Sequence, residues 1–426
     1  MTQSRPGLRH AVAALAYRDY RRFAASLLLT SLGAQLVQTA ILWQVYELTG
    51  SALLLGLTGV ARAVPHMILS LVGGVIADRL DRVRLIQIGQ LANALLVIAL
   101  AALTLTGAVA PWHLYLVTFL NSAFTALTQP ARTALLPSLV PRANLVNAVA
   151  LNATIGQTSQ IVGPALAGIA IASVDLGATY ALNGAIYLAA MVAIIGVRPP
   201  AIAGSVVASA WTSFLEGLRF VRGKPVIVSL LVLDMGATIL GSYRALLPIL
   251  ADRLGVGAGG YGVLSAAPGV GALLGAAAIL SLGDMRYKGM YTLYGVLAYC
   301  GALVVLALSP WFMLTLVAAA LLGTTNAVQM IPRNSAILAI SPDALRGRVE
   351  AFRSMLAGGG PPLGYALSGA LAAAFGVPLA LIAGAAACAA LVAGVGITRR
   401  ELRDPALGAV VEERGARTVG ATPRAR

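Results

Sequence analysis

Charged residues are scarce in this sequence. Of its 426 residues, 11% are Asp, Glu, Lys or Arg, whereas 59% are hydrophobic and the mean hydropathy is +0.86. Because a soluble globular domain carries about 25% charged residues, this composition excludes that class and indicates a chain with many membrane spans. Negative charge is the scarcer sign, since 15 acidic residues stand against 30 Lys and Arg.

Cysteine and histidine are also rare. The two cysteines, Cys300 and Cys388, lie inside apolar runs, which excludes a disulfide framework. With 3 histidines, no His–Glu metal spacing and no Ser–His–Asp set, the sequence offers no catalytic or metal site. It also lacks a phosphate-binding G-x-x-x-x-G-K-[ST] loop, which excludes a nucleotide-driven pump. We therefore expect that the protein is not an enzyme and that it binds neither a metal ion nor a cofactor.

Long apolar runs are what the sequence has in abundance. A helix needs about 20 apolar residues to cross the hydrocarbon core, where each backbone polar group must be satisfied within the segment. The fold class we expect is an all-α membrane protein with twelve transmembrane helices in two pseudo-symmetric six-helix bundles around a central cavity. The expected spans are 23–45, 52–77, 85–106, 112–134, 148–172, 179–197, 226–250, 261–282, 291–308, 311–338, 352–375 and 378–397.

The basic residues predict the orientation. Arginine in short loops marks the cytoplasmic side of a membrane. With the N-terminus inside, all of the 30 basic residues except Arg62, Arg244 and Arg253 fall on that side. The sequence therefore predicts a multi-pass protein of the cell inner (cytoplasmic) membrane with both termini in the cytoplasm. We interpret the net charge of +15 as this topology signal and not as a nucleic-acid surface, because the arginines stand between apolar runs.

A polar stretch near the middle divides the spans six and six. A shift of 201 positions places Arg132 on Arg333 and Gly163 on Gly364, as parallel repeats would. Apolar residues at helical spacing within the polar stretch predict an amphipathic surface helix, and a solvated linker is the alternative. The expected segments are an N-terminal cytoplasmic arm (1–22), a six-helix bundle (23–197), a linker with the amphipathic helix (198–225), a second bundle (226–397) and a disordered basic tail (398–426).

Several motifs resemble the major facilitator superfamily. Residues 74–82, GVIADRLDR, are similar to its signature loop G-x-L-A-D-R-x-G-R-[KR], with Asp81 in place of the later glycine. Residues 163–168, GPALAG, resemble the antiporter motif G-P-x-x-G-G that is typical of exporters. Three further stretches resemble the drug and siderophore exporter branch, that of macrolide efflux proteins and the enterobactin exporter: 130–137, 244–252 and 342–349.

The resemblance implies a secondary active transporter. Its expected function is export of a small amphipathic molecule, such as a drug or siderophore, by alternating access with proton antiport, powered by the proton gradient. An uptake permease or facilitator of the same fold is the alternative. A non-transporting membrane receptor or an intramembrane enzyme is the alternative of another class. The expected partners are a small-molecule substrate and the lipid bilayer, without nucleic acid, for a chain that acts as a monomer.

The signature loop is expected to form half of a gate. The resemblance implies that Asp78 latches the inner ends of spans 2 and 11, with Arg346 or Arg348 as its partner. An exposed ion pair contributes only about 0–1 kcal/mol, which suits a gate that opens under a small bias. A charged loop that merely sets topology is the alternative. The gating candidates are Gly74, Asp78, Arg79, Arg82, Arg346 and Arg348.

The exporter motif comprises Gly156, Gly163, Pro164 and Gly168. Glycines remove side chains and let another helix approach closely, and the proline permits a bend. The resemblance implies that this helix faces span 8 or span 11 and seals the outer side. Ordinary packing of small residues is the alternative.

Charged residues inside spans are costly in hydrocarbon and mark candidate functional sites. Asp234 is the one acidic residue deep in an expected span, so it is the candidate proton carrier; a static ion pair with a basic neighbour is the alternative. Further proton-coupling candidates are Arg62, Arg244 and Glu47, although Glu47 is also placed as an interfacial residue would be. The candidates for the lining of a substrate cavity are Gln35, Gln38, His66, Tyr243 and Asn326.

Overall fold

The computed structural model describes residues 13–197, 210–282 and 287–403, and within these ranges it is helical without β-strands. The expected all-α fold is therefore confirmed. Side chains are described for these ranges except at residues 71, 72, 74–79, 210–214, 343, 344, 351 and 400. Most of the expected N-terminal arm, the start of the linker and the tail from residue 404 lie outside the described residues.

The helices follow the apolar runs. The first half of the chain contains α2 (Arg18–Thr49), α3 (Ala52–Arg79), α4 (Arg82–Leu105), α5 (Pro111–Leu135), α6 (Leu145–Ser173) and α7 (Leu176–Ile194). After the short α8 (Ala210–Arg222), the second half contains α9 (Pro225–Ile239), η4 (Arg244–Leu246), α10 (Leu247–Arg253), α11 (Gly257–Leu282), α12 (Lys288–Leu308), α13 (Phe312–Ile340), α14 (Asp343–Phe375) and α15 (Val377–Thr398).

Among the described residues, 10 helical segments are long and apolar enough to cross a membrane. The expected count of twelve is thus not confirmed. The two expected spans without a counterpart among the ten are 112–134, within α5, and 352–375, within α14. Both are helical, but polar residues in α5 and glycines and prolines in α14 lower their hydropathy.

Asp81, which departs from the glycine of the family motif, has a local structural role. Its carboxylate accepts hydrogen bonds from the backbone nitrogens of Val83 and Arg84, at 2.9 and 3.0 Å. It is therefore the N-cap of α4, where a side-chain oxygen satisfies otherwise unpaired N–H groups. The substitution fixes the start of α4 directly after α3.

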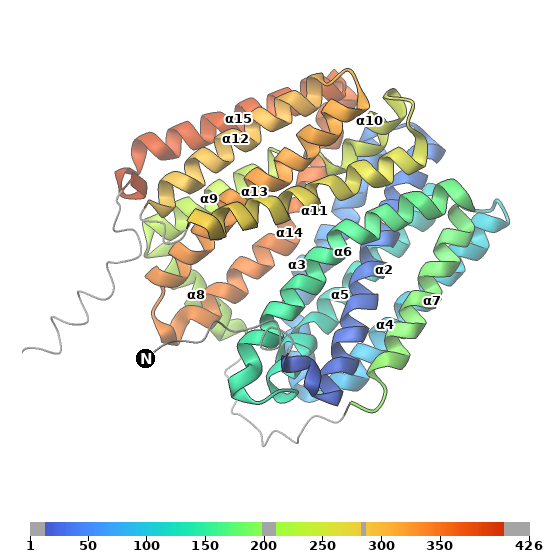
Figure 1. Cartoon of the computed structure of the whole chain (residues 1–426), viewed down its shortest axis with the longest axis horizontal. Coiled ribbons are helices and arrows are strands. Elements are labelled where there is room, and N and C mark those ends of the chain that lie inside the picture. Colours follow the sequence, from blue (N-terminus) through green and yellow to red (C-terminus); the bar gives the residue numbers. More distant parts are fainter. Residues whose placement is uncertain (1–12, 198–209, 283–286, 404–426) are drawn as a thin grey trace, which may run out of the picture.

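The helices form two groups, as Figure 1 shows. Helices α2, α4, α5 and α7 pack mainly within the first group, and α9, α10, α12, α13 and α15 mainly within the second, whereas α3, α6, α11 and α14 also pack extensively across the boundary. Because successive long helices run in opposite directions, each end of the molecule collects alternate helix ends. We call the end that holds Thr49, Ala52 and Ser173 the Thr49 end, and the opposite one, which holds Arg18 and Leu145, the Arg18 end.

Two helix pairs join the halves, α3 with α14 and α6 with α11. In both pairs glycine faces glycine near the Thr49 end. A Cβ atom on Gly168 would lie 2.5 Å from Cα of Gly262, and one on Gly369 would lie 2.7 Å from Cα of Gly56. Since no real Cβ fits at these distances, the missing side chains let the backbones touch. The halves are therefore in direct backbone contact near the Thr49 end.

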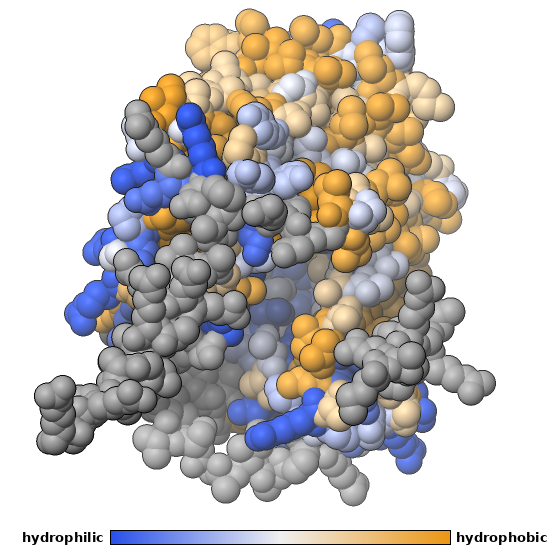
Figure 2. Space-filling model, turned by 60° about the vertical axis from the view of Figure 1, so that its left-hand side comes forward, coloured by the Kyte–Doolittle hydropathy of each residue, from blue (hydrophilic) through white to orange (hydrophobic). Residues whose placement is uncertain are grey.

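The surface differs between the two ends. Figure 2 shows hydrophobic residues over the upper and right parts of one face, and hydrophilic residues around a hollow in its lower half. The lower part of the molecule contains the start of α2 and the end of α7, which belong to the Arg18 end. The hollow thus lies away from the glycine contacts.

Candidate functional site

A cavity of about 540 Å³ lies between the two halves. Its walls come from the middle turns of α2, α3, α5 and α6 on one side, and from α9, η4, α11, α12, α13 and α14 on the other. The lining combines polar side chains, two arginines among them, with apolar ones, at a depth where the outer faces of the helices carry exposed Leu, Ile and Val. A polar cavity at mid-depth between two helical halves is typical of a solute-binding site in a transporter.

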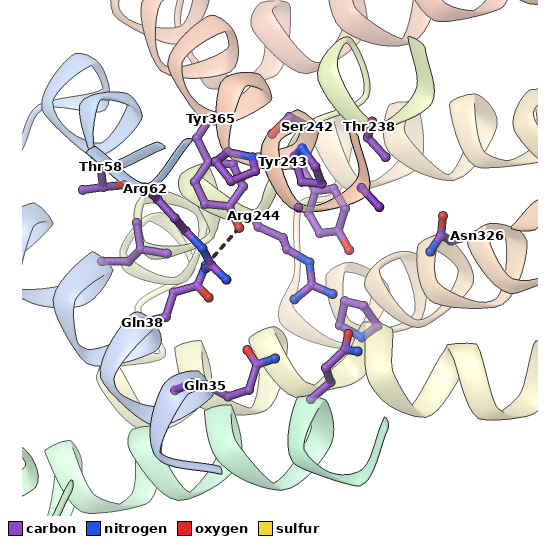
Figure 3. A pocket seen from close by; sticks show the side chains of 18 of the residues that line it. Gln35, Gln38, Thr58, Arg62, Thr238, Ser242, Tyr243, Arg244, Asn326 and Tyr365 are labelled. Carbon is purple, nitrogen blue, oxygen red and sulfur yellow. Dashed lines mark hydrogen bonds between the residues drawn. The ribbon is translucent and has the colours of Figure 1, made fainter. Parts of the chain in front are cut away.

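The five residues that the sequence suggested for a substrate cavity all line this space. Gln35 and Gln38 come from α2, His66 from α3 and Asn326 from α13, and Tyr243 directly precedes η4. The side-chain nitrogen of Gln38 donates a hydrogen bond of 3.3 Å to the hydroxyl of Tyr365 across the interface between the halves (Figure 3). Their participation in substrate binding remains a prediction.

Two arginines suggested for proton coupling line the same cavity. Arg62 belongs to α3 and Arg244 is the first residue of η4, so each half supplies one of them. Figure 3 shows both guanidinium groups inside the cavity, with Gln35 and Gln38 on one side and Asn326 on the other. Both side chains are half-buried. The backbone of Arg62 is fixed by Ser122, whose hydroxyl donates a 2.7 Å hydrogen bond to the Arg62 carbonyl oxygen.

Arg244 reaches the cavity because the helix before it breaks. The sequence suggested one continuous helix over 226–250, but α9 ends at Ile239 and α10 begins only at Leu247. Pro248 lies in the first turn of α10, where its missing N–H is tolerated, whereas inside a continuous helix it would remove a hydrogen bond. The freed carbonyl of Gly241 accepts a 2.8 Å hydrogen bond from the Tyr299 hydroxyl. A broken helix at a transporter's midplane is a recurrent device for exposing binding groups.

Asp234 does not line the cavity. Its carboxylate oxygen lies 2.6 Å from a guanidinium nitrogen of Arg333 on α13, and the two side chains are only 11% and 3% exposed. The same Arg333 nitrogen donates to the Gln329 side-chain oxygen at 3.2 Å, and the Gln329 amide donates to Asn326 at 3.1 Å. A polar chain therefore runs from the buried ion pair to the cavity wall. The ion pair is compatible with both roles that the sequence left open for Asp234, so the proton carrier and the static pair both remain predictions.

Glu47, the remaining proton-coupling candidate, lies apart from these groups. It is exposed close to the C-terminal end of α2 and does not line the cavity. One residue before it, the Tyr46 hydroxyl donates a 2.7 Å hydrogen bond to the carboxylate of Asp252. The Thr49 end thus holds the carboxylates of Glu47, Asp175 and Asp252, and none of the three lines the cavity.

The gating candidates are described only in part. The side chains of Gly74, Asp78 and Arg79 lie outside the described residues, so the latch remains a prediction. Arg82 donates a 3.1 Å hydrogen bond to the carbonyl oxygen of Ala134 on α5. Arg346 donates to the carbonyl oxygen of Leu338 at 3.3 Å.

The second-half candidate Arg348 contacts the linker helix. Its guanidinium forms an ion pair with Glu216 of α8, and α8 packs along α14. Gly217 permits this close packing, because a Cβ there would lie 2.9 Å from the carbonyl oxygen of Arg348. A short helix between the halves is therefore fixed to the N-terminal turns of α14.

The glycines of the exporter motif differ in their surroundings. A Cβ on Gly163 would meet Cβ of Gln35 at 2.5 Å, so this residue lets α6 approach α2 beside the cavity. Gly168 makes the contact with α11 at the Thr49 end, and the neighbouring Pro164 is buried. A Cβ on Gly156 would meet nothing within 4 Å. The helix that carries the motif, α6, packs against α11. Helix α11 contains the expected span 8, which is one of the two partners that the resemblance implied.

Several cavity residues were not singled out from the sequence. They include Thr58, Asn121, Gln157, Gln160, Ser242, Tyr299 and Tyr365. Gln157 and Gln160 stand three positions apart within an apolar run, and this spacing places them on one helix face. Such a polar pair inside a span was a usable signal. The sequence gave no such signal for Tyr299 and Tyr365, because a tyrosine in or near a span can also lie at the membrane–water interface.

The chain matches known proteins over most of its length. The model of a family described as "Transmembrane secretion effector" matches residues 10–409. The chain is 28% identical to "Enterobactin exporter EntS" of Shigella boydii over 348 residues, which cover 81% of this chain and 82% of that protein. It is also 28% identical to "Enterobactin exporter EntS" of Escherichia coli over 337 residues, covering 78% and 77% of the two chains.

Solved structures show the same fold. A bacterial homolog to the human lysosomal transporter Spinster, in an inward-facing and unoccupied conformation, gives a TM-score of 0.73 at 14% identity and covers 94% of this chain and 99% of that one. A D-xylose-proton symporter gives a TM-score of 0.70 at 14% identity, with 89% and 97% covered. At such low identity, these similarities concern the fold alone.

Proposed function

Because this chain belongs to the transmembrane secretion effectors of the major facilitator superfamily, in the branch of drug and siderophore exporters, we propose that it exports a small amphipathic molecule by alternating access. The chain is a membrane transporter and not an enzyme. The observation that carries the proposal is the polar cavity at mid-depth, lined from both halves. Two rigid halves around one site are what alternating access requires.

The proposed architecture has twelve spans in two six-helix bundles, 23–197 and 226–397, which act as a monomer in the cell inner membrane. Both termini lie in the cytoplasm, because the basic residues gather at the Arg18 end. In this orientation the glycine contacts close the outer side and the hollow opens to the cytoplasm. An exporter must first collect its substrate from that side. An uptake permease would release its substrate from the same state, so the support for export over uptake comes from the exporter motif on α6 and from the similarity to exporters.

Proton antiport is the proposed source of energy. The Asp234–Arg333 pair is the proposed coupling site, because it is buried and linked through Gln329 and Asn326 to the cavity. A proton taken up by the carboxylate would remove the negative charge and release the guanidinium. Gln329, which is hydrogen-bonded to Arg333, and Asn326 at the cavity wall would then rearrange. In this scheme, proton and substrate are sensed at opposite ends of one polar chain.

The proposed gate lies at the Arg18 end. Asp78 is its first-half residue, and Arg346 and Arg348 precede the membrane-embedded part of α14. The ion pair between Arg348 and Glu216 supports an involvement of α8, which would follow α14 when the halves move. Since such exposed pairs are weak, substrate and proton can shift the gate with modest free energy.

The experiment compares accumulation of a panel of antibiotics and siderophores in cells with and without the gene, each with and without a protonophore. Export predicts lower accumulation of at least one compound in the cells that express the gene, and the protonophore should abolish the difference. Higher accumulation in those cells would establish uptake instead. A difference that survives the protonophore would contradict proton coupling but leave export standing.

A further inference from the structure

We infer that the substrate is an anion held between Arg62 and Arg244, an assignment that rests on the proposed transport function and adds the chemical class of the cargo. The side chains that can carry a positive charge in the cavity are these two arginines and His66. No Asp or Glu belongs to the described lining residues. The site is therefore built with positive charge alone.

The carboxylates on α9 and α10, the helices on either side of Arg244, are engaged elsewhere. Asp234 pairs with Arg333 outside the cavity lining, and Asp252 accepts the hydrogen bond from Tyr46 near the Thr49 end. Within the described part of the chain, neither Arg62 nor Arg244 has an ion-pair partner. Both are nevertheless half-buried at the mid-depth of a helical bundle. Charges in such places are expensive unless water or an opposite charge compensates them.

Two like charges in one cavity also act on each other. Figure 3 shows both guanidinium groups in the same space, close to Tyr365 and Gln38. Their repulsion is stronger in a partly buried site than in bulk water, because the effective dielectric constant is lower. An anion between them replaces repulsion by two attractions, whereas a cationic drug adds a third positive charge. The cavity thus selects against cations as well as for anions.

The lining further narrows the ligand. Planar guanidinium groups bind carboxylate, phosphate and similar oxyanions through paired hydrogen bonds. Tyr243, Tyr299 and Tyr365 are 5 to 7% exposed and supply aromatic surface beside the arginines. The volume of about 540 Å³ lies within the usual range of small-molecule sites. These features together fit an aromatic or amphipathic oxyanion, whose acidic group is a carboxylate, phosphate or sulfonate.

The origin of the two arginines connects binding with movement. Arg62 belongs to the first half and Arg244 to the second, so an anion between them bridges the interface that must close during transport. In the empty carrier, the two positive charges oppose closure of the halves around the cavity. Neutralising them with substrate removes that opposition. The same contacts would therefore serve recognition and the coupling of binding to closure.

The test uses two dyes that share one skeleton and differ in charge. Binding of the anion fluorescein and of the cation rhodamine 123 to the purified full-length protein is measured by fluorescence anisotropy in detergent. Fluorescein should bind at least ten-fold more tightly. Benzoate, phenyl phosphate and benzenesulfonate are then tested as competitors to identify the acidic group. Equal or tighter binding of rhodamine 123, or no binding of fluorescein or any of the three anions, would overturn the inference.

Matched variants locate the binding. Arg62→Gln and Arg244→Gln should each weaken fluorescein binding at least ten-fold. Arg62→Lys and Arg244→Lys keep the positive charge but not the planar guanidinium, so their affinity for fluorescein should fall less. The lysine variants also serve if a glutamine variant does not fold. Arg253→Gln is the control, because Arg253 is exposed at the Thr49 end and does not line the cavity. Unchanged binding in both glutamine variants would overturn the assignment.

Binding by the purified protein and export by cells separate the charge of the substrate from the transport function. If cells export cationic compounds and Arg62→Gln leaves that export intact, the anion assignment is wrong but the exporter remains. If purified protein binds fluorescein through both arginines while cells show no export of any compound, the anion site stands and the proposed export is wrong.

Discussion

The carboxylate of Asp234 on α9 lies 2.6 Å from the guanidinium of Arg333 on α13, and neither side chain is more than 11% exposed. Loss of one member of a buried ion pair leaves the other charged and uncompensated, which costs about 3–5 kcal/mol. Asp234→Asn is therefore expected to lower the free energy of unfolding by about that amount. Thermal or denaturant unfolding of the purified protein measures the change.

The double variant Asp234→Asn/Arg333→Gln separates the two roles of this pair. A purely static pair predicts that removal of both charges restores stability and also restores proton-driven export in vesicles, because no buried charge is left unpaired. A proton carrier predicts recovered stability without pH-driven export, since the titrating carboxylate is gone. Export by the double variant at the wild-type rate would contradict the proposed coupling site.

How far the sequence could predict the structure is clearest in the helix that carries Asp234. The apolar run of 226–250 is long enough to span a membrane, and a span is what length and hydropathy determine. Neither property reveals that the helix breaks between Ile239 and Leu247. Gly241 and Pro248 were the local signals, but in membrane helices both are also tolerated without a break. The break is what brings Arg244 into the cavity.

Partners distant along the chain were harder to predict than element positions. The sequence identified Asp234 as a buried charge, yet its partner Arg333 lies on the fourth α-helix after α9 and was grouped with the cytoplasmic loops. Gln35, Gln38 and Asn326 were predicted as cavity residues because polar groups in apolar spans need a polar environment. Which helix faces meet depends on packing between the halves, and periodicity within one helix carries no information on that.

A comparison of two glycines in the same motif tests the closure of the Thr49 end. At Gly168 a new Cβ would lie 2.5 Å from Cα of Gly262, whereas at Gly156 it would meet nothing within 4 Å. Overpacking of a close contact costs about 1–3 kcal/mol, so Gly168→Ala should destabilise the protein by that amount and slow export. Gly156→Ala is the matched control and should change neither the free energy of unfolding nor the export rate. Equal behaviour of the two variants in unfolding and export assays would argue against a seal at Gly168.

The ion pair between Arg348 and Glu216 provides a test of the linker helix. Because Glu216 is largely exposed, Glu216→Gln should change the free energy of unfolding by no more than about 1 kcal/mol. If α8 moves with α14 during gating, the same variant should still alter the export rate, and Glu216→Arg/Arg348→Glu should restore it. Arg219→Gln is the control on the same helix, because Arg219 is exposed as well. An unaltered export rate in Glu216→Gln would exclude a gating role for this contact.

An anionic substrate should make export sensitive to the membrane potential. Moving one charge across 100 mV is worth about 2.3 kcal/mol, which corresponds to roughly a 50-fold change in the equilibrium concentration ratio. An inside-negative potential drives anions outward, so it should speed the loss of fluorescein from vesicles whose cytoplasmic side faces inward. The potential is set by a potassium gradient with valinomycin at equal pH on both sides, and vesicles without a gradient are the control. Arg62→Gln and Arg244→Gln vesicles should lose the dye slowly at any potential. A wild-type rate that is the same with and without the potential would mean that the transport cycle moves no net charge, which an anion exchanged for protons does not allow.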